Sequence, residues 1–384
     1  MRGVGIAGVG LVTPLGNSPA GVLAAVRAGK SALALHPGFP EPYFASMLPR
    51  EGASEPFFEQ VSLEAARKAV ENAGIDPADP STGFILSSIK GDIEHIGQSD
   101  VSLAYSAGNI ARGLGVKTQP VVVSNACISG LAALVQGMRM IRAGQYKNVI
   151  VVGTEVQSPF IVTGFQSLKA LSTEPCKPFD ANRVGLNLGE ASAAIVLSLI
   201  PTSGENYFLG RCPKNQFSPD IANPTHKGSY WELVEGAIRN DANHISGPSR
   251  TGEGSYNALR AVLPFVDKKD LAFVNVHGTA TVYNDEMEAI ALNRAGLLDV
   301  PVNALKGYFG HTMGAAGILE SILSMQALEA GVVLATRGFE ELGVSAPVKV
   351  SAQEQPAVGN SFIKLLSGFG GVNGALLFRK GGSL

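Results

Sequence analysis

The sequence has few of the residues that mark secreted, metal-stabilised or nucleic-acid-binding proteins. Of its 384 residues only three are cysteines, Cys127, Cys176 and Cys212, an odd set without the spacing of metal ligands. This argues against a disulfide scaffold or a structural zinc site, and it fits a reducing cytoplasm. Charged residues make up 16% of the chain, the formal net charge is −2 and no basic run occurs. Nucleic acid and anionic membranes are therefore poor candidate partners.

Long apolar runs are also missing. No stretch of the sequence reaches the roughly 18 apolar residues that a membrane-spanning helix needs, because Arg139, Arg142, Glu320 and Glu329 interrupt the longest helical candidates. The first residues run directly into a strand-like pattern without the apolar core of a signal peptide. We therefore expect a soluble, cytoplasmic protein with no membrane span.

Glycine and small apolar residues are abundant instead, with 46 glycines and 45% hydrophobic residues. Short runs rich in Val and Ile alternate with longer amphipathic stretches, which predicts an α/β fold with buried, largely parallel strands. We expect strands at 3–12, 83–88, 120–124, 148–154, 192–199, 206–210, 271–277, 302–304, 361–367 and 372–378. We expect helices at 20–28, 59–73, 102–114, 127–143, 255–263, 285–295 and 314–330.

Two stretches far apart in the sequence share one order of features. Around Cys127, an apolar strand is followed by the cysteine, small residues and an apolar helix. Around His311, a short strand is followed by the glycine-flanked histidine, small residues and another apolar helix. This similarity predicts a duplicated strand-loop-helix unit and two halves, residues 1–200 and 201–384, joined by a connection rich in Pro, Gly and Asn over 201–228.

Cys127 is a candidate nucleophile because of its position. It follows a predicted strand and stands at the start of a predicted helix, where unpaired N–H groups and the helix dipole favour the thiolate. Ser129 and Gly130 leave the first turn uncrowded, so a substrate carbonyl could rest its oxygen on backbone N–H donors. Taken alone, the cysteine also fits a small buried hydrophobic residue.

Two histidines occupy similar positions. His277 closes a predicted strand and is followed by Gly278, and His311 precedes the small residues that open a predicted helix. A core histidine or a surface histidine would explain either residue alone, but three reactive residues in glycine-flanked strand-end loops are improbable by chance. A metal site built from a cysteine and histidines this dispersed is a weaker explanation. The other histidines, His36, His95, His226 and His244, lie in polar or proline-rich surroundings and are expected at the surface.

Motifs along nearly the whole chain extend this set. They are Val9-Gly-Leu-Val-Thr-Pro-Leu-Gly16, Asn125-Ala-Cys127, Gly164-Phe-Gln-Ser-Leu-Lys-Ala-Leu-Ser-Thr173, Lys177-Pro-Phe-Asp180 with Gly189-Glu190, His277-Gly-Thr-Ala-Thr281 with Asn284-Asp285, Lys306-Gly-Tyr-Phe-Gly-His311, and Gly368-Phe-Gly-Gly371 with Asn373. Together they resemble the β-ketoacyl-acyl carrier protein synthases, the elongating type with a Cys-His-His site. The resemblance implies a thiolase-like α/β fold with duplicated βαβαβαββ halves in five layers, α-β-α-β-α.

The resemblance also implies a decarboxylative Claisen condensation in fatty-acid, polyene or polyketide-type synthesis. Cys127 would take an acyl group from a carrier-protein thioester. After malonyl-carrier protein loses CO2, His277 and His311 would bind the enolate oxygen. The N–H groups of Cys127 and Phe369 would bind the oxyanion of acyl transfer, and Phe369 would gate the acyl pocket. No separate cofactor and no metal would be needed, since the substrates are carried on phosphopantetheine.

Other residues receive supporting roles from the same resemblance. Phe165, Thr279, Thr281 and Gly370 would contact substrate. Lys306 would hold an acidic network that orients His311; its acidic members would be Asp285, Glu288 and Glu320. These charged residues also fit an ordinary buried salt-bridge cluster without a catalytic duty, and the sequence leaves both interpretations open.

The expected partners are an acyl carrier protein and a second ketosynthase-like chain, as a homodimer or a heterodimer. The resemblance implies sheet extension near 148–154 as the dimer contact, and it makes Lys68, Arg139 and Lys214 candidates for contacts with the acidic carrier. The compact chain, shortened at 88–120 and 199–228, resembles synthases of specialised pathways, such as aryl polyene clusters, more than the housekeeping fatty-acid enzymes.

Some residues depart from the family pattern. Val184 replaces an Asp, Ala191-Ser192 replaces Gly-Ala and Leu365-Leu366-Ser367 replaces Asn-Ser-Phe.

Three related classes fit the sequence less well. A biosynthetic thiolase needs a second cysteine in the C-terminal glycine-rich loop, where this sequence has none. A starter synthase with a Cys-His-Asn site is disfavoured by the second histidine. A non-catalytic chain-length factor is disfavoured by the intact trio.

Overall fold

The computed structural model describes residues 2–37, 41–51, 56–98, 100–200 and 230–381. The expected strand at 206–210 and the connection at 201–228 lie outside the described residues, as do Cys212, Lys214 and His226. The proposed boundary between the halves falls where β8 (Ala191–Ile200) ends.

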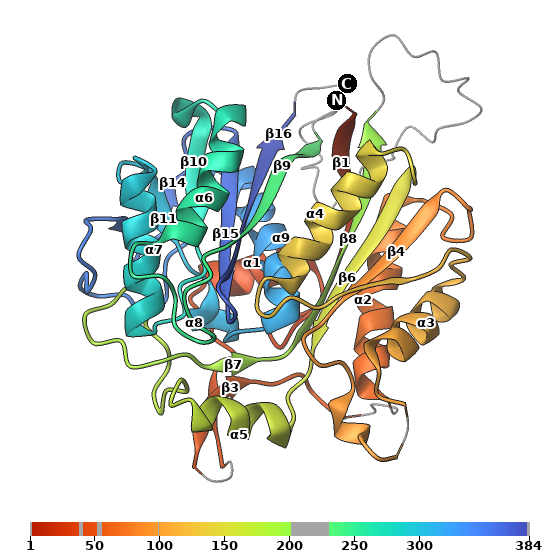
Figure 1. Cartoon of the computed structure of the whole chain (residues 1–384), viewed down its shortest axis with the longest axis horizontal. Coiled ribbons are helices and arrows are strands. Elements are labelled where there is room, and N and C mark those ends of the chain that lie inside the picture. The colour runs from red at the N-terminus through yellow and green to blue at the C-terminus, as the bar shows by residue number, and fades with distance from the viewer. Residues whose placement is uncertain (1, 38–40, 52–55, 99, 201–229, 382–384) are drawn as a thin grey trace.

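Two sets of five strands repeat one arrangement (Figure 1). The first set is ordered β1-β8-β6-β4-β5 in the sheet and the second β9-β16-β15-β10-β11. In chain order, the first set consists of β1 (Gly3–Val12), β4 (Thr82–Ser87), β5 (Val121–Val123), β6 (Asn148–Glu155) and β8. The second consists of β9 (Trp231–Asn240), β10 (Leu271–Asn275), β11 (Pro301–Asn303), β15 (Ser361–Gly368) and β16 (Val372–Lys380).

Strand directions repeat as well. The β4 strand is parallel to β5 and β6, as β10 is to β11 and β15. The β8 strand is antiparallel to β1 and β6, as β16 is to β9 and β15. The duplication expected from the sequence is therefore present in the topology. Pairing of Gly5 with Glu232 and of Ile6 with Trp231 joins the sets, and β13 (Lys349–Val350) extends the combined sheet to eleven strands.

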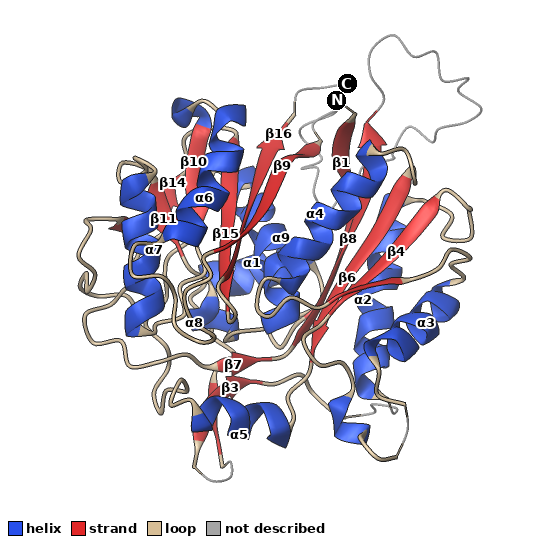
Figure 2. Cartoon of the chain, in the orientation of Figure 1, coloured by secondary structure: helices blue, strands red, loops and turns tan. Residues whose placement is uncertain are grey.

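Helices form three layers around the two sets of strands (Figure 2). In the first half, α2 (Phe57–Ala73) and α3 (Leu103–Leu114) cover the outer face. In the second half, α6 (Glu253–Val262) and α7 (Val282–Arg294) do the same. Between the sets lie α4 (Ser129–Arg142) and α9 (Ala316–Glu329), which pack against each other and against strands of both halves. The expected order α-β-α-β-α is confirmed.

The two central helices approach almost backbone to backbone. A Cβ atom on Gly317 would lie 2.4 Å from the Leu131 nitrogen, and one on Gly130 would lie 2.6 Å from the Gly314 carbonyl oxygen. Helix α9 is buried on every side except at its last residue, Glu329, as expected for an apolar helix inside a protein. The segments that follow Cys127 and His311 are thereby fixed to each other.

Smaller elements lie around this frame. Helix α5 lies beside β3 and β7 at the lower end of the molecule in Figure 1. The elements are α1 (Pro19–Arg27), β2 (Ala34–His36), β3 (Tyr43–Ser46), α5 (Pro159–Ser167), β7 (Leu188–Gly189), α8 (Lys306–Phe309), β12 (Val332–Val333) and β14 (Gln355–Pro356), with 3-10 turns at Ile93–His95, Leu263–Phe265, Lys268–Asp270 and Met313–Ala315.

Two expected element bounds require correction, and the edge of the sheet can be located. The strand before His277 ends at Asn275, and α4 begins at Ser129 rather than at Cys127, so both reactive residues lie in loops. The β6 strand, expected near the dimer contact, has β4 on one side and β8 on the other. It has no free edge for a partner strand. In the described part of the chain, β5 ends the sheet on this side.

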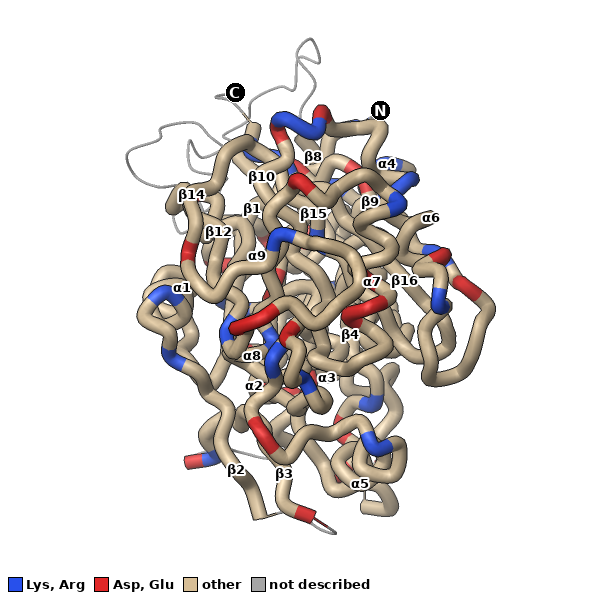
Figure 3. Tube along the Cα trace, turned by 90° about the vertical axis from the view of Figure 1, so that its left-hand side faces the viewer, with Lys and Arg blue, Asp and Glu red and all other residues tan. Residues whose placement is uncertain are grey.

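Charge is distributed as the sequence suggested. Figure 3 shows basic and acidic segments interspersed along the trace. Among the described residues, no helix combines the length and the apolar character needed to cross a membrane.

Candidate active site

Cys127 lies in a strained turn between β5 and α4. The preceding Ala126 has a φ of 45°, which costs a residue with a side chain about 1–3 kcal/mol. Ser129 stabilises the turn: its Oγ accepts from the Asn125 N–H at 2.7 Å and donates to the Ala126 carbonyl at 2.6 Å. The turn therefore presents the thiol beyond the end of the strand.

Burial dominates the acidity of this thiol. It raises the pKa of Cys127 to about 11, although the charge of Lys306 and hydrogen bonds from the N–H groups of Phe369 and Cys127 oppose that rise. The backbone N–H groups favour the thiolate, as expected from the sequence, but burial outweighs them. The same two N–H groups are the donors expected for the oxyanion of acyl transfer.

His311 has one nitrogen occupied and one free. Its Nδ1 accepts a hydrogen bond from the Met313 N–H at 3.2 Å, so the neutral ring carries its proton on Nε2. That Nε2 is buried and has no hydrogen-bond partner in the described structure. The backbone is fixed as well, because the His311 N–H donates to the Asn187 carbonyl at 2.7 Å. The ring therefore offers an N–H donor to the site.

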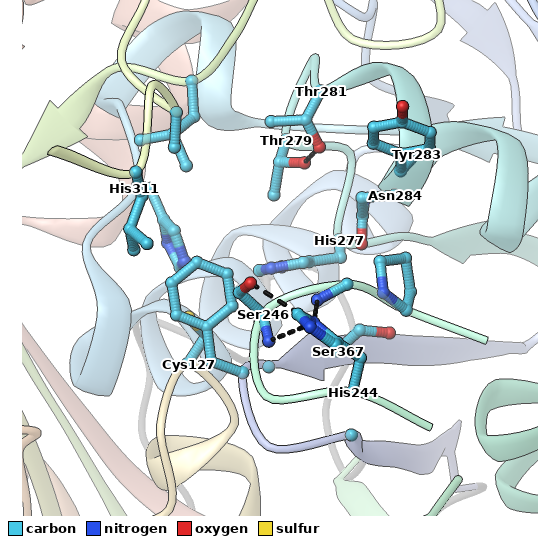
Figure 4. Close-up of a pocket in the computed structure, with 18 of the residues that line it drawn as sticks. Cys127, His244, Ser246, His277, Thr279, Thr281, Tyr283, Asn284, His311 and Ser367 are labelled. Atoms are coloured by element: carbon cyan, nitrogen blue, oxygen red, sulfur yellow. Dashed lines mark hydrogen bonds between the residues drawn. The ribbon is translucent and has the colours of Figure 1, made fainter. Parts of the chain in front are cut away.

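The three reactive side chains come together (Figure 4). The Sγ atom of Cys127 and one ring nitrogen from each of His277 and His311 lie within 4.8 Å of one another. The centroids of the two imidazole rings are 4.9 Å apart, and the ring planes are inclined by 79°. Burial and the charge of Lys306 hold both histidine pKa values well below the usual 6.5. This site thus has neutral imidazoles beside a buried positive charge, which favours an anion over a metal cation.

The charged residues divide into two groups, which corrects the single network expected around Lys306. Lys306 Nζ donates to Glu320 Oε1 at 2.9 Å and to the His277 carbonyl at 2.6 Å. Asp285 and Glu288 bind backbone N–H groups instead. Glu288 accepts from the His277 N–H at 2.7 Å, so both groups contact the backbone of His277 rather than that of His311.

A pocket of about 360 Å³ leads to the trio. Thr279 and Thr281, joined by a hydrogen bond of 2.8 Å between their hydroxyls, lie on its wall. Its remaining lining is mixed in polarity and comes from both halves of the chain. The lining consists of Cys127, Phe165, Leu168, Lys169, Ala170, Leu186, Asp241, His244, Ser246, Gly247, Pro248, His277, Thr279, Thr281, Tyr283, Asn284, His311, Ser367, Gly368, Phe369, Gly371 and Asn373.

Phe369 lies in the loop between β15 and β16 and stacks on Phe165 of α5, with ring centroids 5.8 Å apart. Both rings line the pocket. Gly370, expected at the substrate, fixes the loop instead: its N–H donates to the Ile245 carbonyl, and its carbonyl accepts from Asn240 Nδ2. The loop is therefore tied to the segment that follows β9.

Sequence reasoning missed two residues here. Lys364 is fully buried in β15 and binds Glu320, and the signal for it is a lysine inside an otherwise apolar strand. His244 is exposed, as expected, but it also lines the pocket. Its Nδ1 accepts from the N–H groups of Ser246 and Gly247, which shapes that side of the entrance. Val184, which departs from the family pattern, is 62% exposed and is not part of the pocket lining.

Comparison with known proteins gives consistent results. The model of the β-ketoacyl synthase N-terminal domain matches residues 38–199, and that of the C-terminal domain matches residues 230–340. A 3-oxoacyl-[acyl-carrier-protein] synthase 2 of Vibrio cholerae is 28% identical over 99% of each chain. The tetracenomycin polyketide synthase ketoacyl synthase alpha subunit of Streptomyces glaucescens is 28% identical over 98% of this chain and 96% of its own.

Solved structures share the fold. A β-ketoacyl synthase from Burkholderia phymatum STM815 has a TM-score of 0.83 at 25% identity, covering 99% of this chain and 100% of its own. A ketosynthase from Xenorhabdus doucetiae, solved with its chain length factor, has a TM-score of 0.82 at 22% identity, covering 99% of this chain and 98% of its own. The chain belongs to the β-ketoacyl synthase family and is a condensing acyltransferase.

Proposed function

We propose that this chain condenses an acyl group held on Cys127 with malonyl-acyl carrier protein. The observation that supports the proposal most strongly is the pair of neutral imidazoles beside the thiol, with the unpaired His311 Nε2–H available as a donor. Two neutral donors aimed at one oxygen stabilise charge that develops only in the transition state.

In the first half-reaction, Cys127 Sγ attacks the thioester carbonyl of the acyl-carrier protein. The carbonyl oxygen takes the negative charge between the N–H groups of Cys127 and Phe369. The carbon–sulfur bond to the carrier then breaks, and the carrier thiol leaves with the proton that Cys127 gave up. Burial raises the pKa of the free thiol, so the thiol form predominates before the substrate arrives.

In the second half-reaction, the malonyl thioester loses CO2 and its electron pair passes into the enolate. His277 and His311 donate hydrogen bonds to the enolate oxygen, and the nearby charge of Lys306 stabilises it further. The enolate carbon attacks the acyl-Cys127 carbonyl, and a carbon–carbon bond forms. The carbon–sulfur bond to Cys127 then breaks, and the thiolate takes a proton from water. Apart from this water, only side chains and backbone N–H groups take part, so the chemistry requires no separate cofactor.

The phosphopantetheine arm of the carrier enters through the pocket beside Thr279 and Thr281, whose hydroxyls are available to its amide groups. The partner chain, a second copy or a related subunit, adds a strand to β5. Sequence similarity to fatty-acid and polyketide synthases supports one of these two pathways. The sparse cysteines favour a reducing compartment such as the cytoplasm.

Intact-protein mass tests the first half-reaction. The chain is incubated with a panel of acyl-carrier proteins beside two matched variants, Cys127→Ala and Cys176→Ala; Cys176 is the other buried cysteine of the described residues. We expect a mass increase of one acyl group in the wild type and in Cys176→Ala, and none in Cys127→Ala. Adding malonyl-carrier protein should discharge the acyl group as a β-ketoacyl product.

Two results would contradict the proposal. Absence of loading on folded protein across the panel would favour a non-catalytic partner subunit. Loading that persists in Cys127→Ala would place the nucleophile elsewhere.

A further inference from the structure

Lys364 is an unusual residue for the interior of a buried strand. Its side chain is fully buried in β15, where Ile363 and Leu365 flank it. A buried ammonium group is costly unless it is fully hydrogen-bonded. Its Nζ donates to Glu320 Oε2 at 2.5 Å and to the Val276 carbonyl at 3.1 Å.

Glu320 holds two lysines rather than one. Lys306 binds its Oε1 and Lys364 binds its Oε2, so two buried lysines share one carboxylate, and the charge of Glu288 also acts on Lys364. Apolar side chains of similar volume commonly stabilise a protein as well as a buried ion cluster does. Both lysines also bind backbone carbonyl groups, which points to a role beyond packing.

The lysines and Glu288 bind both peptide groups that flank His277. In the peptide before His277, the Val276 carbonyl accepts from Lys364, and the His277 N–H donates to Glu288 Oε1 at 2.7 Å. In the peptide after it, the His277 carbonyl accepts from Lys306, and the Gly278 N–H donates to Glu288 Oε2 at 2.8 Å. Each peptide thus has a cation at its oxygen and a carboxylate at its nitrogen.

We propose that Lys364 is a positioning residue: together with Lys306 it fixes the backbone that carries His277, and it adds positive charge beneath the site where the enolate forms. Strand β10 ends at Asn275, so regular pairing between strands no longer positions these peptides. A displacement of an imidazole by about 1 Å costs on the order of 100-fold in rate. The bonds from Lys364 and Lys306 take the place of the missing strand pairing.

The proposal rests on the proposed function and predicts a pH dependence. Burial lowers the pKa of Lys364 to about 8, and the charged groups that act on it are Glu320, Lys306 and Glu288. His277 and His311 in turn feel its charge. Above about pH 8, Lys364 loses its proton and one of the two cations that bind these peptides becomes neutral. We expect the decarboxylation rate to fall there.

Kinetics of three variants test the role. Lys364→Met removes the charge at similar volume, and Lys364→Arg keeps a charge that does not titrate. Lys380→Met, at the last residue of β16, removes an ion pair with Glu329 of α9. For Lys364→Met we expect kcat for malonyl decarboxylation to fall about 100-fold with little change in KM. Acyl transfer to Cys127 should change less, and Lys380→Met should match the wild type.

The conservative variant keeps the test informative if Lys364→Met does not fold. Lys364→Arg should lose less decarboxylation activity than Lys364→Met, and its rate should no longer fall near pH 8, because a guanidinium stays charged there. A folded Lys364→Met with an unchanged kcat, or a Lys364→Arg profile that still falls near pH 8, would overturn the proposal.

A measurement without substrate separates this proposal from the proposed function. The sequence has six histidines, so the ring signals in a ¹H–¹³C spectrum of histidine-labelled protein are few, and His277→Gln assigns one of them. In Lys364→Met, or in Lys364→Arg if that variant alone folds, we expect the His277 signal to shift while that of His95 stays in place. An unshifted His277 signal refutes the positioning role. A shifted signal in a protein whose wild type does not decarboxylate malonyl-carrier protein refutes the proposed function alone.

Discussion

Phe369 and Phe165 form an offset stack, with ring centroids 5.8 Å apart and planes 25° from parallel. One ring comes from a loop of the second half and the other from a helix of the first, and both line the pocket that reaches Cys127. The stacked pair is therefore positioned to cover an acyl group held on the thiol.

Replacing Phe369 with Ala should expose the acyl-enzyme to water. We expect the acyl-Cys127 intermediate to hydrolyse faster in the absence of malonyl-carrier protein, because the ring and about 0.5–1.5 kcal/mol of aromatic contact are lost. Intact-protein mass followed over time gives the half-life, and Phe369→Leu, which keeps apolar volume, serves as the control. Equal half-lives for the wild type and Phe369→Ala would show that the stacked pair does not shield the intermediate.

Substitutions of His311 should depend on whether a donor remains at the position of Nε2. His311→Ala removes the donor, and we expect a 10²–10³-fold loss of malonyl decarboxylation. His311→Gln places an amide N–H near the same point and should retain more of the rate than His311→Ala. The comparison uses kcat for decarboxylation. Equal losses in both variants would mean that the ring acts through something other than this N–H.

Stability should fall in acid because both site histidines have depressed pKa values. As the pH falls below 6.5, the unfolded chain takes up protons that the folded chain does not, so the free energy of unfolding decreases. Each histidine contributes at most about 1.4 kcal/mol per pH unit in this window. Burial raises the pKa of Glu288 to about 7. Between pH 4.5 and 7 the folded chain therefore holds a proton that the unfolded chain has lost, so Glu288 increases the free energy of unfolding as the pH falls.

Comparison with His311→Gln isolates the histidine term, because both proteins retain Glu288. Urea unfolding between pH 5 and 6.5 should give a shallower loss of stability in the variant than in the wild type. Parallel curves would show that His311 is not held neutral by the fold.

The close approach of the central helices predicts contrasting effects of two glycine substitutions. Gly317→Ala places a methyl group 2.4 Å from the Leu131 nitrogen and should destabilise the protein by about 1–3 kcal/mol or more. Gly108→Ala in α3 meets no atom within 4 Å and should stabilise by up to about 1 kcal/mol. Urea midpoints measure both. A Gly317→Ala protein as stable as the wild type would mean that α9 shifts without cost.

Much of the frame could be predicted because local periodicity determines buried strands and helices. The sequence predicts the strand at Gly3–Val12 with its observed bounds, since an apolar run there meets turn residues. The sequence does not indicate strand β9, because Glu232 and Glu235 interrupt its apolar pattern. Their partners, Arg379 and Arg142, lie far away in the sequence.

The reactive residues could be predicted because glycine-flanked loops after strands expose side chains at one edge of the sheet. The charged residues that position them could not be predicted in the same way, because which residue pairs with a buried charge depends on the tertiary fold. Of the three acidic residues expected around Lys306, Glu320 binds it, whereas Asp285 and Glu288 bind backbone N–H groups. A lysine such as Lys364 ordinarily indicates a solvent-facing position, but it is buried against Glu320. The acidity of Cys127 also depends on how deeply the fold buries it.

The packing of α4 against α9 has a consequence for synthesis of the chain. Helix α4 emerges from the ribosome long before α9 is made, so the apolar face of α4 that α9 covers stays exposed while the second half is translated. Such an exposed surface is a target for chaperones and a start point for aggregation. Truncations that end before α9 should therefore accumulate in inclusion bodies, even though they carry a complete set of first-half strands.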